Sequence, residues 1–419
     1  MSTDHHALFT AALGLSAPWE VSDIRFDAEA RRIDFDVTFA SGSRFACPAC
    51  GAEGQPVHDT RERTWQHLHF FEHQAFIHAA VPRVRCQDCG KTAQVEVPWA
   101  RPGSGFSQLF EAMAITLCRE MPVRQVAALL GVGDDALWRI LDHYVGAARA
   151  EEDYSEVRAV GIDETAARRG QDYITIFQDL DEQRLLFACP GRSQATVARF
   201  AEDLRQHGGD PASIDAACID MSKAYIAGVQ RHLPQAAITF DAFHLVKLAN
   251  EAVDEVRRAE VRSESVLKGT RWLWLKDAYR FSIRQITELH HLSRMRLKTG
   301  RAWRIKEMLR DILTRSRDRD EAEQALKKWY SWARRCHLEP FKRFALTVKA
   351  HWEGILNRFD SRLSNGAVEG MNAQIQAAKA RARGFRRVEN LITVSYLVCG
   401  KLSHLPASPY RTTSRAAGA

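Results

Sequence analysis

The spacing of hydrophobic residues changes its period along the chain. Apolar and polar residues alternate over residues 65–84, which is the period of half-buried β-strands. Over residues 106–145 the apolar residues recur at helical spacing, with a break near Gly131 and Gly133. From Arg158 onward short apolar runs return. The pattern predicts a β-rich N-terminal region, then a pair of helices and then a longer α/β region.

The α/β region has a definite order of elements. Strands are expected at residues 158–163, 173–178, 184–189, 216–220 and 236–240, and helices at residues 193–207, 222–233 and 243–261. Three consecutive strands followed by alternating helices and strands is the order of a ribonuclease-H-like fold, with a mixed sheet and its chemistry at strand ends. The predicted fold class is therefore α/β.

Two acids close strands of this region. Asp163 ends the first expected strand and Asp220 ends the fourth, and in a ribonuclease-H-like sheet these two strands are neighbours. Two carboxylates held close together resist joint ionisation unless a cation lies between them. Because the ligands are hard oxygens, Mg²⁺ or Mn²⁺ is favoured over zinc.

Other acids compete for this role. Glu164 adjoins Asp163, but successive strand residues point to opposite faces. We favour Asp163, which shares a face with Gly161, where a small side chain leaves room for substrate. Asp179 and Asp181 are more typical of turn acids, while Asp241 and His244 either line the site or begin a helix.

A third carboxylate is expected on a later helix. On a helical wheel Val368, Met371, Ile375, Ala378 and Ala382 form an apolar stripe. A polar row runs beside it: Asn365, Glu369, Asn372, Gln376, Lys379 and Arg383. This row predicts that Glu369 faces a sheet edge. The amide and cationic side chains of the same row would then lie along bound DNA. The alternative is an exposed helix glutamate.

The helical pair at residues 123–141 fits a helix-turn-helix. Val126, Leu129 and Leu130 are expected to face inward from the first helix, as are Leu137, Ile140 and Leu141 from the second. Asp134 or Asp135 is a candidate cap for the second helix. In a DNA-binding version the start of that helix enters the major groove. An αα-hairpin in an ordinary bundle is the alternative.

Composition narrows the class of protein. The 419 residues are 45% hydrophobic and 26% charged, near the averages of folded proteins, and carry a net charge of +7. No apolar run is long enough to span a membrane and no secretory signal is apparent, so a cytoplasmic protein is expected. The positive charge permits a polyanionic partner without proving one.

The cysteines suggest a metal site. Nine cysteines in a chain without an export signal argue against a disulfide framework. Cys47 and Cys50 form one Cys-x-x-Cys pair, Cys86 and Cys89 form another, and each is followed by a glycine suited to a tight turn. Four thiolates suit one structural zinc ion. A redox pair, or a histidine ligand from between the pairs, is the alternative.

These motifs together resemble insertion-sequence transposases of the ISL3 family. The resemblance covers residues 47–402 and rests on the cysteine pairs, the helix-turn-helix and five short motifs: 160–164 (VGIDE), 218–222 (CIDMS), 240–254 (FDAFHLVKLANEAVD), 364–372 (SNGAVEGMN) and 382–386 (ARGFR). It implies that Asp163, Asp220 and Glu369 are a metal-binding catalytic triad. One departure is Ala242, where relatives often carry arginine after the aspartate.

The expected organisation follows from these modules. A zinc-ribbon-like module occupies residues 1–100, a helix-turn-helix 101–150, a catalytic domain 151–260 and 359–403, a helical insertion 261–358, and a flexible tail 404–419. The insertion resembles one found in the family. Its six tryptophans are expected to be core anchors rather than base-stacking platforms: Trp272, Trp274, Trp303, Trp329, Trp332 and Trp352.

The function expected from these features is DNA transposition. Two Mg²⁺ or Mn²⁺ ions would support strand cleavage and transfer, with a homodimer joining two transposon ends on double-stranded DNA. The expected DNA contacts are Arg124, Trp138, Arg139, Asn372, Lys379, Arg383 and Arg386. The alternatives are a DNA-binding regulator with an inactive catalytic domain, and another ribonuclease-H-like nuclease.

Overall fold

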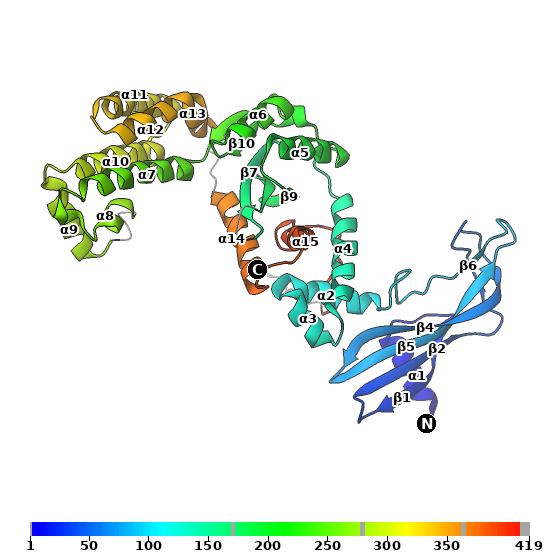
Figure 1. Ribbon diagram of the computed structural model, residues 1–419. Helices are drawn as coiled ribbons and strands as arrows, with labels where there is room; N and C mark the ends of the chain where they lie inside the picture. Colours follow the sequence, from blue (N-terminus) through cyan, green and yellow to red (C-terminus); the bar gives the residue numbers. More distant parts are fainter. Residues whose placement is uncertain (1, 169–171, 277–280, 362–365, 411–419) are drawn as a thin grey trace, which may run out of the picture. The chain divides into compact units, whose positions relative to one another are not determined.

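The computed structural model describes residues 2–168, 172–276, 281–361 and 366–410 (Figure 1). They form two compact units, one from the described parts of 1–147 and 404–419 and the other from those of 148–403. Ser364 and Asn365, which belong to one of the sequence motifs, lie outside the described residues. Within the described residues, no helix combines the length and apolarity that crossing a bilayer requires.

The first unit opens with helix α1 (Ser2–Ala12) and a six-stranded sheet of order β1-β2-β5-β4-β3, with β6 added beside β5. Its strands are β1 (Trp19–Asp27), β2 (Arg32–Phe39), β3 (Arg44–Phe45), β4 (Gln55–Phe70), β5 (His73–Arg85) and β6 (Thr92–Gln94). The alternation over residues 65–84 corresponds to β4 and β5, which form an antiparallel hairpin. Trp65 and Ile77 pair across it and are both buried, so the strand prediction is confirmed.

The hairpin also brings the cysteine pairs together. Val57, near the start of β4, pairs with Val84, near the end of β5. The first cysteine pair lies between β3 and β4 and the second lies between β5 and β6, so both loops meet at the same end of the hairpin.

Three helices follow in the first unit: α2 (Gln108–Glu120), α3 (Val123–Leu130) and the first part of α4 (Asp134–Ala150). Gly131 ends α3 in the left-handed conformation, with φ 67°, and its N–H donates to the Ala127 carbonyl. Glycine adopts this φ without steric cost. The predicted helix, glycine turn and second helix are confirmed.

Two details of the helix-turn-helix prediction are wrong. Leu129 is 57% exposed, because the buried face of α3 follows the spacing of Val123, Val126, Ala127 and Leu130. Asp134 and Asp135 lie in the first turn of α4 instead of preceding it. There their charges favour the positive end of the helix dipole.

The second unit contains a five-stranded sheet of order β11-β10-β7-β8-β9. Its strands are β7 (Ala159–Ala166), β8 (Tyr173–Asp179), β9 (Arg184–Pro190), β10 (Ala216–Ile219) and β11 (Ala237–Phe240). Strands β7, β8 and β9 pair antiparallel, whereas β10 pairs parallel to both β7 and β11. The connecting helices are α5 (Gln194–Gln206), α6 (Lys223–His232) and α7 (Ala242–Glu260). This is the predicted ribonuclease-H-like sheet.

Asp163 does not close its strand as expected. Pairing with β8 continues as far as Ala166 opposite Tyr173, so β7 extends three residues beyond Asp163. Its parallel neighbour β10 ends at Ile219, and Asp220 follows it. The antiparallel partner thus prolongs β7 past the point at which parallel pairing stops.

Helices cover both faces of this sheet. Phe177 of β8 stacks on Phe200 of α5, with ring centroids 4.4 Å apart, on the face that carries Ile162. Helix α14 (Gly366–Arg381) covers the opposite face, where Gly161 lies under Val368. Helix α15 (Val388–Cys399) contacts β9.

The helical insertion is confirmed. It contains α8 (Arg271–Leu275), α9 (Ile283–Arg294), α10 (Lys298–Arg315), α11 (Arg319–Arg335), α12 (Glu339–Ala350) and α13 (Trp352–Ser361). Trp274 and Trp329 are fully buried and donate to Thr270 Oγ1 and to the Ile305 carbonyl. Trp352 is also buried and Trp303 and Trp332 partly so, but Trp272 is 63% exposed. The core-anchor prediction is therefore wrong for Trp272.

Candidate active site and zinc centre

The four paired cysteines converge in the first unit. Their Sγ atoms all lie within 4.8 Å of one another. Across the two pairs, Cys47 Sγ is 3.9 Å from Cys89 Sγ and Cys50 Sγ is 3.6 Å from Cys86 Sγ. Among the described residues, no other group of three or more histidine, cysteine or acidic side chains meets this spacing.

The two cysteine loops have the same local structure. The N–H of Gly51 donates to the Cys47 carbonyl and that of Gly90 to the Cys86 carbonyl, and both glycines have positive φ, 76° and 70°. A backbone hydrogen bond from Ala49 lowers the pKa of Cys47 to about 7, which favours the thiolate that zinc binds. These features fit one structural zinc ion.

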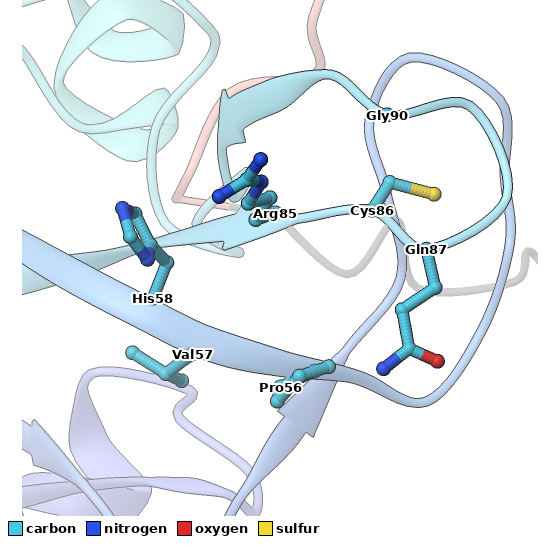
Figure 2. A pocket seen from close by; sticks show the side chains of 7 residues that line it. All are labelled: Pro56, Val57, His58, Arg85, Cys86, Gln87 and Gly90. Atoms are coloured by element: carbon cyan, nitrogen blue, oxygen red, sulfur yellow. The ribbon is translucent and has the colours of Figure 1, made fainter.

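Two of the five histidines between the pairs hydrogen-bond other side chains. His67 Nδ1 is 2.8 Å from Ser107 Oγ, and His78 Nε2 is 2.5 Å from Asp34 Oδ1. Figure 2 shows a pocket beside the second cysteine loop. It is lined by Pro56, Val57, His58, Arg85, Cys86, Gln87 and Gly90. The Cys86 sulfur points away from His58 and Arg85 in this view, so these two polar groups line the pocket without joining the thiol cluster.

In the second unit, strand register aligns three aspartates. Cys218 of β10 pairs with Gly161 of β7, and Ile219 of β10 pairs with Phe240 of β11. Continuing each register sets Asp220 beside Asp163 on one side and Asp241 on the other. Neighbouring strands are about 4.8 Å apart. The sheet therefore carries a row of three carboxylates where β10 and β11 end beside β7, which itself continues to Ala166.

The environment of Asp163 makes its negative charge costly. Its pKa is raised to about 6, chiefly by burial and also by the nearby carboxylates of Asp220 and Asp241, although a hydrogen bond from the Glu164 N–H and the charge of His244 act in the opposite direction. The Glu164 N–H donates to Asp163 Oδ1 at 2.7 Å, and Asn372 Nδ2 donates to Oδ2 at 2.6 Å.

Glu164 lies on the other face of β7, as strand alternation predicts. Its carboxylate is 3.8 Å from Arg192, and it hydrogen-bonds Tyr225, whose hydroxyl is 2.9 Å from Thr175 Oγ1. Asp179 is a turn acid as expected, because its carboxylate accepts from the N–H groups of Asp181 and Glu182.

Asp220 and Asp241 each stabilise the start of a helix. Asp220 Oδ1 accepts from the Ser222 N–H at 2.9 Å, just before α6. Asp241, only 3% exposed, caps α7 by accepting from the Phe243 N–H at 3.0 Å. It also accepts from His244 Nδ1 at 2.9 Å, and this hydrogen bond raises the pKa of His244. Both alternatives for Asp241 thus hold together: it begins a helix and it lines the site.

The described structure does not bring Glu369, Asp163 and Asp220 within 4.8 Å of one another. Glu369 is exposed in the first turn of α14. Burial raises its pKa, and the carboxylate of Asp241 raises it further. The sequence thus missed that Asp241 is the carboxylate electrostatically coupled to both Asp163 and Glu369. Its position directly after β11, equivalent to that of Asp220 after β10, is the signal that points to it.

The apolar stripe of α14 is confirmed, but its setting differs from the prediction. Val368, Met371, Ile375 and Ala378 are buried. They pack against β7, which is the central strand and not a sheet edge. A side chain at Gly161 would lie 2.4 Å from Val368 Cγ2. This glycine therefore makes room for a helix instead of for substrate.

Two of the expected DNA contacts on α14 have partners inside the protein. Besides Asn372, Lys379 Nζ donates to the Ala166 carbonyl at 2.5 Å. Gln376 Nε2 donates to Thr165 Oγ1 at 2.5 Å and to the same carbonyl at 3.1 Å. This part of the polar row fastens α14 to the end of β7.

The remaining expected DNA contacts are more open. Arg124 is exposed on α3, as is Arg139 on α4, where its Nε donates to the Asp135 carbonyl at 3.3 Å. Trp138 is half-buried. Arg383 and Arg386 are exposed after α14, and the Arg386 carbonyl accepts from Arg168. The exposed arginines leave charge available for phosphates.

Comparison with known protein families gives three consecutive matches. A model described as the zinc-finger of transposases IS204, IS1001, IS1096 and IS1165 matches residues 43–89. One described as the helix-turn-helix domain of transposase family ISL3 matches residues 95–145. The ISL3 model of the DDE type, described as transposase, matches residues 160–395.

Curated relatives agree with these matches. The chain is 30% identical to the transposase for insertion sequence element IS1001 of Bordetella parapertussis, over 82% of this chain and 86% of that protein. It is 28% identical to the transposase for insertion sequence element IS1557 of Mycobacterium tuberculosis, over 96% of this chain and 97% of that protein.

Proposed function

The chain belongs to the ISL3 family of transposases, and from that premise we propose that it cleaves and joins transposon ends through metal ions held by Asp163, Asp220 and Glu369. The resemblance inferred from its motifs is thereby confirmed, as is the main prediction that the chain is a DNA transposase. The identity of the metal ions, their three carboxylate ligands and the action on transposon ends are what we propose here.

The aligned register of β7 and β10 carries this proposal. It sets Asp163 of β7 beside Asp220, which directly follows β10, and burial together with the neighbouring carboxylates raises the pKa of Asp163. The donors are carboxylate oxygens, which suit Mg²⁺ or Mn²⁺. Glu369, in the first turn of α14, is proposed as the third carboxylate.

Each side chain has a role in the proposed chemistry. Two bound divalent ions would activate the attacking oxygen and stabilise the leaving one. Asp163 and Asp220 hold the ions from the sheet, and Glu369 contributes from the helix. Asp241 keeps His244 oriented beside them through the 2.9 Å hydrogen bond. The reaction needs no covalent link between protein and DNA.

DNA recognition is assigned to the first unit. The start of α4, with Trp138 and Arg139, would enter the major groove, while Arg124 would contact the backbone. Arg383 and Arg386 of the second unit would neutralise phosphates near the cleavage site. Because two ends must be joined, a homodimer on DNA is the proposed active form.

The experiment uses the full-length protein and labelled DNA carrying the element's terminal inverted repeats. With Mg²⁺, the wild type is expected to cut and transfer strands, while Asp163→Asn, Asp220→Asn and Glu369→Gln lose at least about 100-fold in rate, since each removes a charge that holds the ions. All three should still bind the ends. Unchanged strand transfer in Asp163→Asn would contradict the proposed triad.

A further inference from the structure

Asn372 occupies a special position on α14. It lies three residues after Glu369, so both side chains project from the same side of the helix. Its Nδ2 donates to Asp163 Oδ2 at 2.6 Å, while the other oxygen of that carboxylate accepts from the Glu164 N–H. Asn372 is thus the side chain that joins the helix of the proposed third acid to the first acid.

The other end of the Asn372 amide has no partner among the residues that the structure describes. Its Oδ1 is buried and accepts no hydrogen bond from them. The orientation of the amide follows from its neighbour, because an ionised carboxylate only accepts and must face the NH₂ group. A buried carbonyl oxygen without a donor is unfavourable and uncommon in folded proteins. A ligand bound beside Asp163 would supply the partner that this oxygen lacks.

Attachment of α14 to β7 does not by itself explain the hydrogen bonding of Asn372. Gln376, one turn further along α14, also bonds to β7, and its amide NH₂ reaches Thr165 and Ala166. Lys379 adds a third link to the same strand. Asn372 differs from both because its partner is a site carboxylate and because its own buried oxygen is unfilled.

We propose that Asn372 is a ligand-shell residue of the metal site, an inference that rests on the proposed function. Its NH₂ group orients the Asp163 carboxylate, and its Oδ1 receives a divalent cation, either directly or through one of the cation's waters. An amide oxygen is a suitable donor for such hard cations. The site then comprises an Asp163–Asn372 pair in addition to the three acids.

The test measures Mn²⁺ binding to the full-length protein without DNA, by electron paramagnetic resonance. Asn372→Leu keeps the side-chain volume but removes the oxygen, and it should weaken Mn²⁺ binding at least about tenfold, as loss of supporting groups around a metal does. Gln376→Leu, the matched control on the same helix, should change it less than about threefold. If Mn²⁺ affinity fell equally in both variants, Asn372 would only hold α14 against β7, and the proposal would be overturned.

A second variant, Asn372→Asp, keeps the proposal testable if Asn372→Leu does not fold. Asn372→Asp retains an oxygen donor but loses the NH₂ group that orients Asp163, so its Mn²⁺ affinity should lie clearly above that of Asn372→Leu. An affinity no higher than that of Asn372→Leu would overturn the proposal. Asp163→Asn separates the two hypotheses. If it abolishes Mn²⁺ binding while Asn372→Leu binds normally, only the role of Asn372 fails; if it binds Mn²⁺ and transfers strands normally, the proposed triad itself fails.

Discussion

At the residue scale, burial makes the negative charge of Asp163 unfavourable in the candidate site. Asp163 is half-buried and lies in line with Asp220 and Asp241. Its pKa of about 6 exceeds the ordinary 3.8. A carboxylate whose folded pKa is raised favours folding when protonated. Its contribution to stability is complete below pH 3.8 and is lost as the pH rises through 6.

The first prediction follows from this sign. Without divalent metal at pH 7.5, Asp163→Asn should be more stable than the wild type by about 1–2 kcal/mol, less than the full shift implies because the groups are coupled. Near pH 4 the difference should nearly vanish. Urea unfolding at both pH values measures it. Lower stability of Asp163→Asn at pH 7.5 would contradict the assigned environment.

Added divalent metal should make the wild type more stable than Asp163→Asn. A cation that binds only the folded wild type stabilises it by mass action, by about 2.7 kcal/mol at a hundred times the Kd. The wild type should therefore gain stability on adding Mn²⁺ at pH 7.5, whereas Asp163→Asn should gain little. The gain should diminish as the pH falls below 6, because protons compete for the carboxylate.

At the element scale, the close approach of α14 to β7 builds the site. Gly161 lets Val368 pack directly against the strand, and Asn372, Gln376 and Lys379 then reach β7. The polar row that resembles a DNA track in the sequence is in part a set of links to the sheet. Only the pairing of helix with strand reveals this.

The second prediction concerns this contact. Gly161→Ala should destabilise the protein by about 1–3 kcal/mol and reduce cleavage, since the new Cβ would lie 2.4 Å from Val368 Cγ2 and 2.9 Å from Leu180 Cδ2. Gly370→Ala is the control: its Cβ meets nothing within 4 Å, and alanine favours a helix by up to about 1 kcal/mol. Similar melting temperatures for the two variants would refute the tight packing.

The third prediction concerns α4. Arg139→Ala should weaken binding to the terminal repeats and make binding less dependent on salt, because it removes an exposed cation near the start of the helix. Arg149→Ala is not a suitable comparison, since that residue is bonded to Asp203 within the protein. Arg315→Ala is a better control, as Arg315 is exposed on α10. Fluorescence anisotropy at several salt concentrations provides the measurement.

At the scale of the whole molecule, the two units divide the chemistry. The thiol cluster and the helix-turn-helix belong to the first unit, and the carboxylate row belongs to the second. Each unit has its own buried core. The soft thiol donors and the hard carboxylate donors therefore lie in separate units.

The fourth prediction tests this division. Cys89→Ser should lose bound zinc and weaken recognition of the terminal repeats at least about tenfold, because structural zinc contributes directly to folding. The Mn²⁺ affinity of the second unit should remain unchanged. Cys336→Ala, which removes a buried thiol of the second unit, should retain zinc. Loss of Mn²⁺ binding in Cys89→Ser would show that the units are not independent in this respect.

The sequence by itself determined the order of modules, the zinc ligands and the ribonuclease-H-like strand order. Strand and helix periods are local, and two Cys-x-x-Cys pairs carry their ligand geometry within each loop. The apolar stripe of α14 was readable for the same reason. Alternation along β7 likewise separated Asp163 from Glu164.

Only the tertiary structure decided what these elements meet. That Asp241 joins Asp163 and Asp220 depends on register between strands distant in sequence. That Gly161 accommodates a helix, and that Asn372 holds Asp163, depends on contacts across some 200 residues of chain. Leu129 and Trp272 were expected to be buried from the sequence but are exposed. An apolar residue is buried only when another element packs over it. Local pattern fixes the type of an element, whereas packing between elements fixes the site.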